Sequence, residues 1–114
     1  NDGTLRTDSL TFRPRATVIA TGTSPVVPPE WRKILGDRLL TSDDFFELET
    51  LSGRIAVVGM GPVGLELGQA LARLGIEVTG FDPSPNLGGV SHPDLQELAR
   101  SAMRSEFRII AATA

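Results

Sequence analysis

The sequence predicts an α/β fold in which strands and helices alternate as β-α-β-α-β, and three observations carry that prediction. Two short β-type runs, at residues 54–58 and 77–81, enclose a run at residues 62–74 with the apolar spacing of a helix. A glycine-rich turn joins the first run to that helix, and a second helical run and a third apolar run follow. Short crossovers between such strands are right-handed, so we expect a parallel sheet in the order 3-2-1.

Composition limits the function classes. The chain has 114 residues and a formal net charge of −3, so we expect at most one complete domain and no nucleic-acid partner. It has no long apolar run, so we expect no membrane partner and a cytoplasmic location. The absence of cysteine excludes disulfides, thiolate zinc sites and thiol redox chemistry within this chain. His92 is the single histidine, so we also expect no metal site.

The N-terminal quarter contains two strand-like segments and a connector. Residues 1–12 could form a short hairpin or an edge strand. The β-branched run Thr17–Ala20 is followed by glycine and proline, which predicts a buried strand and an exit turn. Three prolines in residues 25–29 then predict a stiff extended connector, and we place a module boundary there.

Helix signals appear twice before the second strand. Thr41, followed by acidic residues, predicts the capped start of a short helix. Pro62 suits the first turn of a longer helix, and Gly75 suits its left-handed stop. The apolar residues of that longer helix predict one buried stripe, formed by Val63, Leu67, Ala70, Leu71 and Leu74.

The last third of the chain predicts a second helix and a third strand. Ser91 to Asp94 resembles a capping box ahead of a helix that ends near Ser105, and residues 107–111 form the third apolar run. With the preceding elements this gives a three-layer Rossmann-like half-domain.

A dinucleotide fingerprint lies at the centre of this unit. Gly59, Gly61 and Gly64 follow a strand and open a helix, and Asp82 ends the next strand, 23 positions after Gly59. We expect Gly59 to permit the turn, Gly61 to let a diphosphate approach, and Gly64 to let the helix pack closely. Free amides at the helix start, around Pro62 and Val63, would face the anion, and Asp82 would accept hydrogen bonds from the adenosine ribose. The alternative interpretation is a glycine turn that only connects β to α, with Asp82 as an ordinary turn residue.

Two motifs at a characteristic separation resemble those of a known family. The runs Val18-Ile-Ala-Thr-Gly-Thr-Ser-Pro25 and Gly59-Met-Gly-Pro-Val-Gly-Leu-Glu-Leu-Gly68 resemble the middle of pyridine nucleotide-disulfide oxidoreductases, in the dihydrolipoamide dehydrogenase and mercuric reductase branch. The resemblance implies that the glycine loop binds NAD(P) and that Glu66 lies near the nicotinamide. It also implies that the segment Ala20, Thr21 and Gly22 contributes to an FAD site. Read from the residues alone, Glu66 could equally be a solvated helix glutamate.

The resemblance further implies an enzyme that transfers a hydride from NADH to FAD and passes electrons to a disulfide or similar acceptor. The flavin fingerprint, the redox cysteines and the interface domain of that family do not occur in this chain. We therefore expect a fragment with no catalytic residue of its own, whose partners are a dinucleotide and the remainder of its parent chain. Residues 1–26 would be a remnant of the FAD-binding domain, 27–52 a connector, and 53–114 an incomplete NAD-binding domain. We also expect the fragment to self-associate through residues 17–20 or an open sheet edge.

Charge predicts the choice of nucleotide. No arginine or lysine occurs in residues 83–91, and a 2′-phosphate would meet the Asp82 carboxylate, so we expect NAD over NADP. Two other interpretations stay open: a stand-alone dinucleotide-sensing module, and a glycine loop that binds FAD itself. The Ala-Thr-Gly segment at residues 20–22, upstream of the glycine loop, argues against both.

Overall fold

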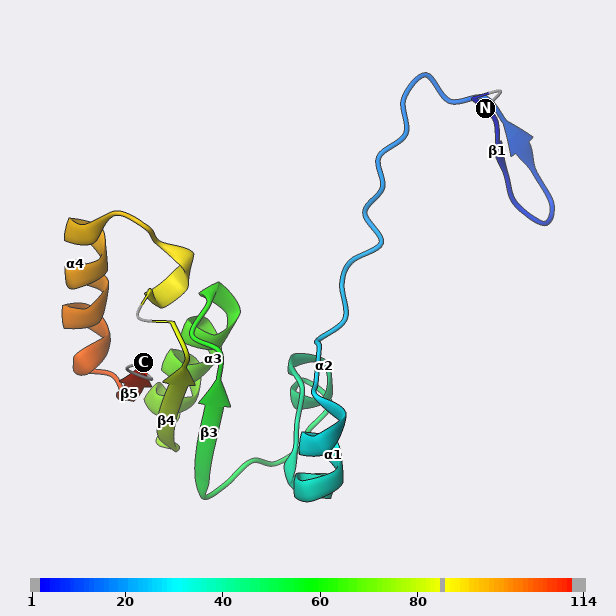
Figure 1. Ribbon diagram of the computed structural model, residues 1–114. Coiled ribbons are helices and arrows are strands. Elements are labelled where there is room, and N and C mark those ends of the chain that lie inside the picture. Colours follow the sequence, from blue (N-terminus) through cyan, green and yellow to red (C-terminus); the bar gives the residue numbers. More distant parts are fainter. Residues whose placement is uncertain (1–2, 85, 112–114) are drawn as a thin grey trace. The chain divides into compact units, whose positions relative to one another are not determined.

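The computed structural model describes residues 3–84 and 86–111, with the side chain of Ala111 left undescribed. The chain divides into two compact units, Asn1–Leu48 and Glu49–Ala114 (Figure 1).

The first unit begins with a small hairpin. Strands β1 (Leu5–Arg6) and β2 (Thr11–Phe12) pair antiparallel, and the amide of Thr7 donates to the Leu10 carbonyl across the turn. This is one of the two arrangements that the sequence allowed for residues 1–12.

The strand expected at Thr17–Ala20 does not form. Residues 16–28 carry no regular secondary structure, and Val18 and Ile19 are 87% and 84% exposed. A strand is stabilised by hydrogen bonds and side-chain packing from a neighbouring strand, and within the described part of this unit no strand pairs with these residues. The β-branched composition alone is therefore not enough.

Two helices and a 3₁₀ turn complete the first unit. Helix α1 spans Pro29–Leu35, η1 spans Gly36–Arg38, and α2 spans Ser42–Phe45. Helix α2 has the expected cap: the Thr41 hydroxyl accepts from the Asp44 amide, and the Asp44 carboxylate accepts from the Thr41 amide at 2.9 Å. Helix α1 was not expected. Its Pro29 occupies the first helical position, where proline is tolerated, so the last proline of the connector starts a helix.

The second unit is the expected β-α-β-α-β fold. Its strands are β3 (Arg54–Val58), β4 (Glu77–Asp82) and β5 (Arg108–Ala111), and its longer helices are α3 (Pro62–Arg73) and α4 (Pro93–Arg104). All strand pairs are parallel and β4 is central, which confirms the order 3-2-1. The α/β class predicted from the sequence is thus confirmed.

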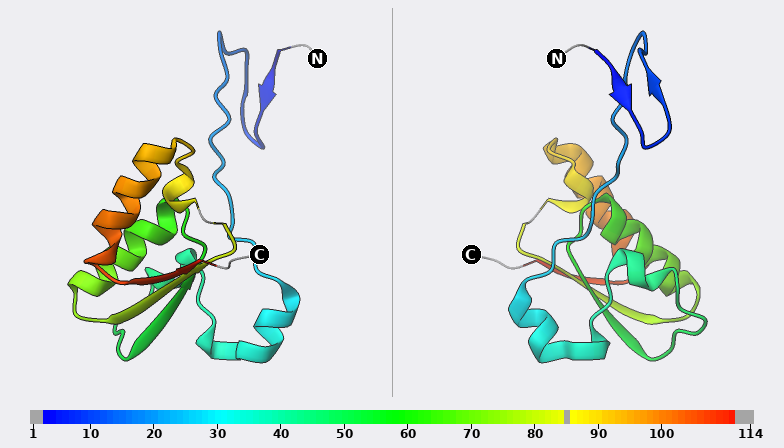
Figure 2. Two further views of the ribbon diagram at one scale, coloured as in Figure 1. Left: turned by 60° about the vertical axis from the view of Figure 1, so that its left-hand side comes forward. Right: turned by 90° about the vertical axis from the view of Figure 1, so that its right-hand side faces the viewer.

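The layering differs from the expectation in one respect. Helices α3 and α4 lie on the same face of the sheet, so the described residues of this unit form two layers, not three (Figure 2). The two crossovers step across the sheet in the same direction, and right-handed connections of that kind put both helices on one side. Among the described residues of the unit, no helix lies on the other face.

The core lies between the sheet and α3. The buried apolar side chains are Met60, Leu71, Val78, Leu87 and Phe107. The close approach of α3 depends on Gly68, because a Cβ there would lie 2.7 Å from the Phe107 ring. The helix therefore turns its glycine face toward the sheet.

That rotation overturns the expected buried stripe of α3. Val63 is 58% exposed, Leu74 is 80% exposed, and Ala70 is also exposed, whereas Leu71 is buried and Leu67 is half-buried. The stripe lies roughly a quarter turn from the face that Gly64 and Gly68 present to the sheet and the loop. Apolar spacing identified the helix correctly and its buried face wrongly.

Helix α4 also differs in its start. Its N-cap is His92, no side chain caps it, and the capping box expected from Ser91 does not form. Pro93 occupies the first helical position, so the helix begins later than that motif requires.

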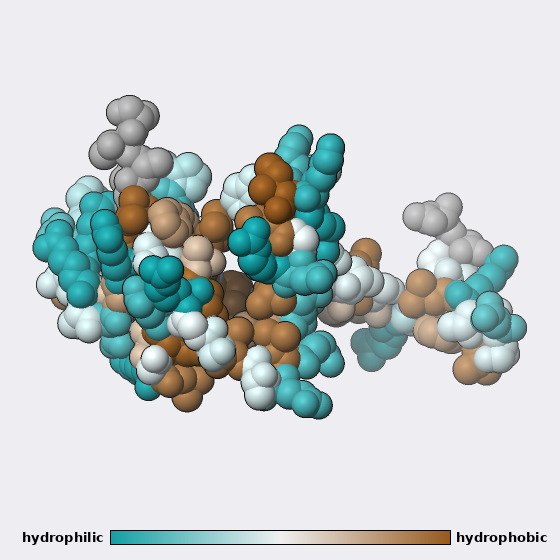
Figure 3. Space-filling model, turned by 90° about the horizontal axis from the view of Figure 1, so that it is seen from below, coloured by the Kyte–Doolittle hydropathy of each residue, from teal (hydrophilic) through white to brown (hydrophobic). Residues whose placement is uncertain are grey.

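Apolar surface remains on the molecule. The face shown in Figure 3 carries hydrophobic patches among hydrophilic ones, and the exposed large hydrophobic residues include Val58, Leu95 and Leu98. Among the described residues, no helix combines the length and the apolar character that a bilayer crossing needs.

Candidate functional site

The glycine loop between β3 and α3 contains three glycines with three different environments. Gly59 has φ +98°, a left-handed conformation that favours glycine. Gly64 is crowded, since a Cβ there would lie 1.8 Å from the Gly59 carbonyl oxygen. The turn and the helix packing of this unit therefore account for both glycines.

Gly61 is different, because none of its contacts with the described residues requires it to be glycine. Its φ of −68° and ψ of −175° are extended backbone that any residue adopts, and a Cβ there would meet no atom within 4 Å. The space beside Gly61 is open, as an approaching ligand would need.

Unpaired amides follow at the helix start. Gly61 is the N-cap of α3, and the first intrahelical bond runs from the Leu65 amide to the Gly61 carbonyl at 3.0 Å. Pro62 has no amide hydrogen, and no side chain caps this helix end. The amides of Val63 and Gly64 therefore have no carbonyl partner within the helix, and such groups attract anions.

Asp82 lies at the tip of β4 and faces the glycine loop. One carboxylate oxygen accepts from the Met60 amide at 2.5 Å, and the other accepts from the Ser84 amide at 2.6 Å. A carboxylate offers about four acceptor positions, so it can take further hydrogen bonds from a ligand. Asp82 is partly buried, and it joins the end of β4 to the loop.

Met60 contributes more than the sequence suggested. Its side chain is fully buried, and it packs so closely that a Cβ on Gly80 would lie 2.5 Å from its sulfur. Its carbonyl accepts from the Gly88 amide at 2.7 Å. Gly88 belongs to η2 (Leu87–Gly89), which contacts α3 near its start. Met60 thus connects β4, α3 and η2, and a free position in a glycine motif gives no signal of this.

The other expected site residues are Glu66 and the segment Ala20, Thr21 and Gly22. Glu66 is exposed on α3, as its position on the helix predicted. Ala20, Thr21 and Gly22 lie in the first unit, where all three are exposed. Within the second unit, the structure brings together Gly59, Gly61, Pro62, Val63, Gly64 and Asp82.

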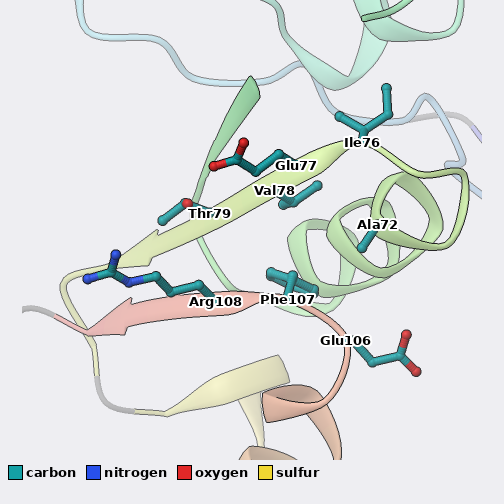
Figure 4. Close-up of a pocket in the computed structure, with 8 residues that line it drawn as sticks. All are labelled: Ala72, Ile76, Glu77, Val78, Thr79, Glu106, Phe107 and Arg108. Atoms are coloured by element: carbon teal, nitrogen blue, oxygen red, sulfur yellow. The ribbon is translucent and has the colours of Figure 1, made fainter. Parts of the chain in front are cut away.

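A separate hollow of about 360 Å³ lies where β4 begins, at the opposite end of that strand from Asp82 (Figure 4). Val78 and Phe107 line it, together with Glu106. The Glu106 carboxylate already has hydrogen-bond partners. It accepts from the Arg73 guanidinium at 2.6 Å and from the side-chain amide of Gln69 at 3.1 Å.

Those contacts set the charge state of Glu106. The hydrogen bond from Arg73 holds the pKa of the Glu106 carboxyl below its usual range, and the same bond raises the pKa of Arg73. The pair fastens the last turn of α3 to the segment before β5. It is a structural ion pair, and the described residues contain no cluster of side chains that could hold a metal ion.

The parallel sheet, the same-side helices and the glycine loop define a Rossmann-like α/β protein. Comparison with known proteins gives the family. Residues 3–111 match the family of pyridine nucleotide-disulphide oxidoreductases, and the chain belongs to that family.

Similar curated proteins are oxidoreductases. A mercuric reductase of Staphylococcus aureus is 34% identical over 85% of this chain and 18% of its own length. A dihydrolipoyl dehydrogenase 2 of Haloarcula marismortui is 35% identical over 69% of this chain and 18% of its own length. A chloroplastic dihydrolipoyl dehydrogenase 2 of Arabidopsis thaliana is 35% identical over 81% of this chain and 16% of its own length. The chain thus spans less than a fifth of the length of these relatives.

Proposed function

We propose that the second unit binds NAD as part of a flavin-dependent oxidoreductase. The observation that carries this proposal is the space beside Gly61, which is open among the described residues and adjoins amides of Val63 and Gly64 that have no partner within the helix. Packing of the described residues does not explain glycine at position 61, whereas a diphosphate approaching the backbone explains it.

Each of the grouped residues has a role in this proposal. The amides of Gly61, Val63 and Gly64 would hold the diphosphate, and Asp82 would accept from the adenosine ribose. Asp82 is suited to that role because one of its oxygens already accepts from the loop amide of Met60, and the carboxylate retains further acceptor positions. Glu66, exposed on the first two turns of α3, would lie on the nicotinamide side and orient the ring.

The wider reaction is proposed from the family. The bound nicotinamide would supply a hydride to FAD, and two electrons would pass to a disulfide or a similar acceptor. The family match also covers the first unit, which supports a contribution of Ala20, Thr21 and Gly22 to an FAD site, and a domain division into 1–26, 27–52 and 53–114. The names of the relatives point to mercuric ion and dihydrolipoyl groups as the range of substrates.

The proposal is tested by the choice of nucleotide. Calorimetric titration of the intact protein should show tighter binding of NAD than of NADP, because a 2′-phosphate would meet Asp82 and no cation in residues 83–91. The double variant Asp82→Ala/Pro83→Arg should reverse the ratio of the two dissociation constants. The ratio is the useful quantity, since loss of the Asp82–Met60 bond should weaken both nucleotides.

Two results would contradict the proposal. A wild-type protein that binds neither nucleotide would refute the site. An unchanged ratio in the double variant would refute the assignment of selectivity to Asp82.

A further inference from the structure

Helix α4 buries a glutamine and exposes its leucines. Gln96 is 5% exposed, whereas Leu95 and Leu98 on the same helix are 55% and 66% exposed. Burying an amide is unfavourable unless its hydrogen bonds are satisfied, so this inversion requires an explanation.

The hydrogen bonds of Gln96 are directed at one turn. Its Oε1 accepts from the Leu87 amide at 3.0 Å, and its Nε2 donates to the Leu87 carbonyl at 3.0 Å and also to the Val90 carbonyl. Oε1 accepts from Arg100 as well, at 3.4 Å. A glutamine has two donor hydrogens and two acceptor positions, and all four are used here. Gln96 therefore holds the backbone at both ends of the turn, at Leu87, which begins η2, and at Val90, which follows it.

The clamped turn in turn holds the glycine loop. Gly88, in the middle of η2, donates its amide to the Met60 carbonyl at 2.7 Å. Gly88 has φ +64°, and a Cβ there would lie 3.2 Å from a Leu65 methyl group, so the turn fits closely against α3. The path from Gln96 to Met60 consists of two successive hydrogen-bonded contacts.

This contact fixes the direction of the Gly61 amide. In a trans peptide the C=O and the N–H of one plane point in opposite directions, and none of the described peptide bonds is cis. Because the Met60 carbonyl is held toward Gly88, the Gly61 N–H on the same plane points away from η2. On its Cβ side, Gly61 meets no described atom within 4 Å, so a ligand can approach this part of the backbone.

We propose that Gln96 is a positioning residue of the nucleotide site, which acts through η2 to aim the Gly61 amide at the diphosphate. It touches no ligand itself. The inference rests on the proposed function, and it adds a residue for which the sequence gives no motif.

The test is Gln96→Met in the intact protein, which keeps the side-chain length and removes all four hydrogen bonds. Gln69→Met is the matched control. Gln69 is a partly buried glutamine in the second half of α3, and its side chain donates a hydrogen bond to Glu106. We expect Gln96→Met to weaken NAD binding by about three- to tenfold, the loss of one or two net hydrogen bonds. Gln69→Met should leave the dissociation constant within about twofold.

Residue-resolved amide exchange separates positioning from general stability. The Gly88 amide should exchange at least tenfold faster in Gln96→Met than in the wild type, with no such change in Gln69→Met. Gln96→Glu keeps the acceptor oxygen but loses the donor, so the Gly88 amide should exchange as fast in this variant as in Gln96→Met.

Equal NAD affinity in Gln96→Met and wild type would overturn the inference, as would an equal loss in the Gln69→Met control. If the wild type binds no NAD, the proposed function fails, and the exchange of Gly88 alone decides whether Gln96 positions the loop.

Discussion

Replacing Gly61 with serine should separate binding from stability in the glycine loop. Gly61 is the N-cap of α3, its backbone is extended, and no atom lies within 4 Å of a Cβ placed there. Serine is a better N-cap than glycine, because its oxygen accepts from the amide of the second or third helical residue. Gly61→Ser should therefore leave the free energy of unfolding unchanged or raise it by a few tenths of a kcal/mol.

The same change should weaken nucleotide binding. The serine hydroxyl would occupy the amides of Val63 or Gly64 and fill the space beside position 61. A hydrogen bond to a charged group contributes about 1.5–3 kcal/mol, so the loss of one amide–phosphate contact should raise the dissociation constant by about tenfold or more.

Gly64→Ala is the contrasting variant. Its Cβ would lie 1.8 Å from the Gly59 oxygen, and that backbone atom would have to retreat by 1.2 Å to reach 3.0 Å. The retreat would also strain the Met60–Asp82 bond of 2.5 Å, which lies on the same peptide plane. Overpacking of this kind typically costs about 1–3 kcal/mol, against a gain of up to about 1 kcal/mol from helix propensity. We expect a net loss of stability.

Denaturant unfolding at constant m-value measures stability, and calorimetric titration with NAD measures affinity. The reasoning is refuted if Gly61→Ser binds NAD as the wild type does. It is also refuted if Gly64→Ala is as stable as the wild type.

The other predictions concern charge and association. Because Arg73 lowers the pKa of Glu106, the ion pair stabilises the fold above the ordinary glutamate pKa of 4.5, and this contribution is lost as the pH falls through the lowered value. Unfolding midpoints of Glu106→Gln and wild type should therefore converge on acidification, and a constant difference would contradict the assignment. We also propose that residues 1–114, expressed alone, self-associate through the exposed segment 17–20 or an open edge of the three-stranded sheet. Sedimentation should show association that Ile19→Lys reduces, and a monomer at high concentration would exclude it.

The second unit could be predicted from the sequence because its signals are local. Residues 54–58 match β3 at both ends, and Pro62 and Gly75 bracket α3 as expected. Each of these positions depends on a turn or cap residue beside it, and such preferences act without the rest of the fold.

The predictions from the sequence are wrong where the structure of a segment depends on a neighbouring element. Residues 17–20 have strand composition but no pairing strand among the described residues of their unit. The buried face of α3 is set by how closely Gly64 and Gly68 approach their neighbours, which apolar spacing does not record.

The site was predictable in its glycines and acid, but its support was not. Met60 fills a position that the motif leaves free, and its burial depends on Gly80 and η2. Gln96 is a polar residue between exposed leucines, so a sequence pattern would place it on the surface. Both residues are recognised only through contacts between elements distant along the chain.

A crystal structure of the intact protein with NAD would show whether the amides at the start of α3 receive a diphosphate. We expect diphosphate oxygens about 2.7–3.2 Å from the amide nitrogens of Gly61 and Val63, with Asp82 accepting from the adenosine ribose. A diphosphate bound elsewhere, with the Gly61 amide facing solvent, would contradict this expectation.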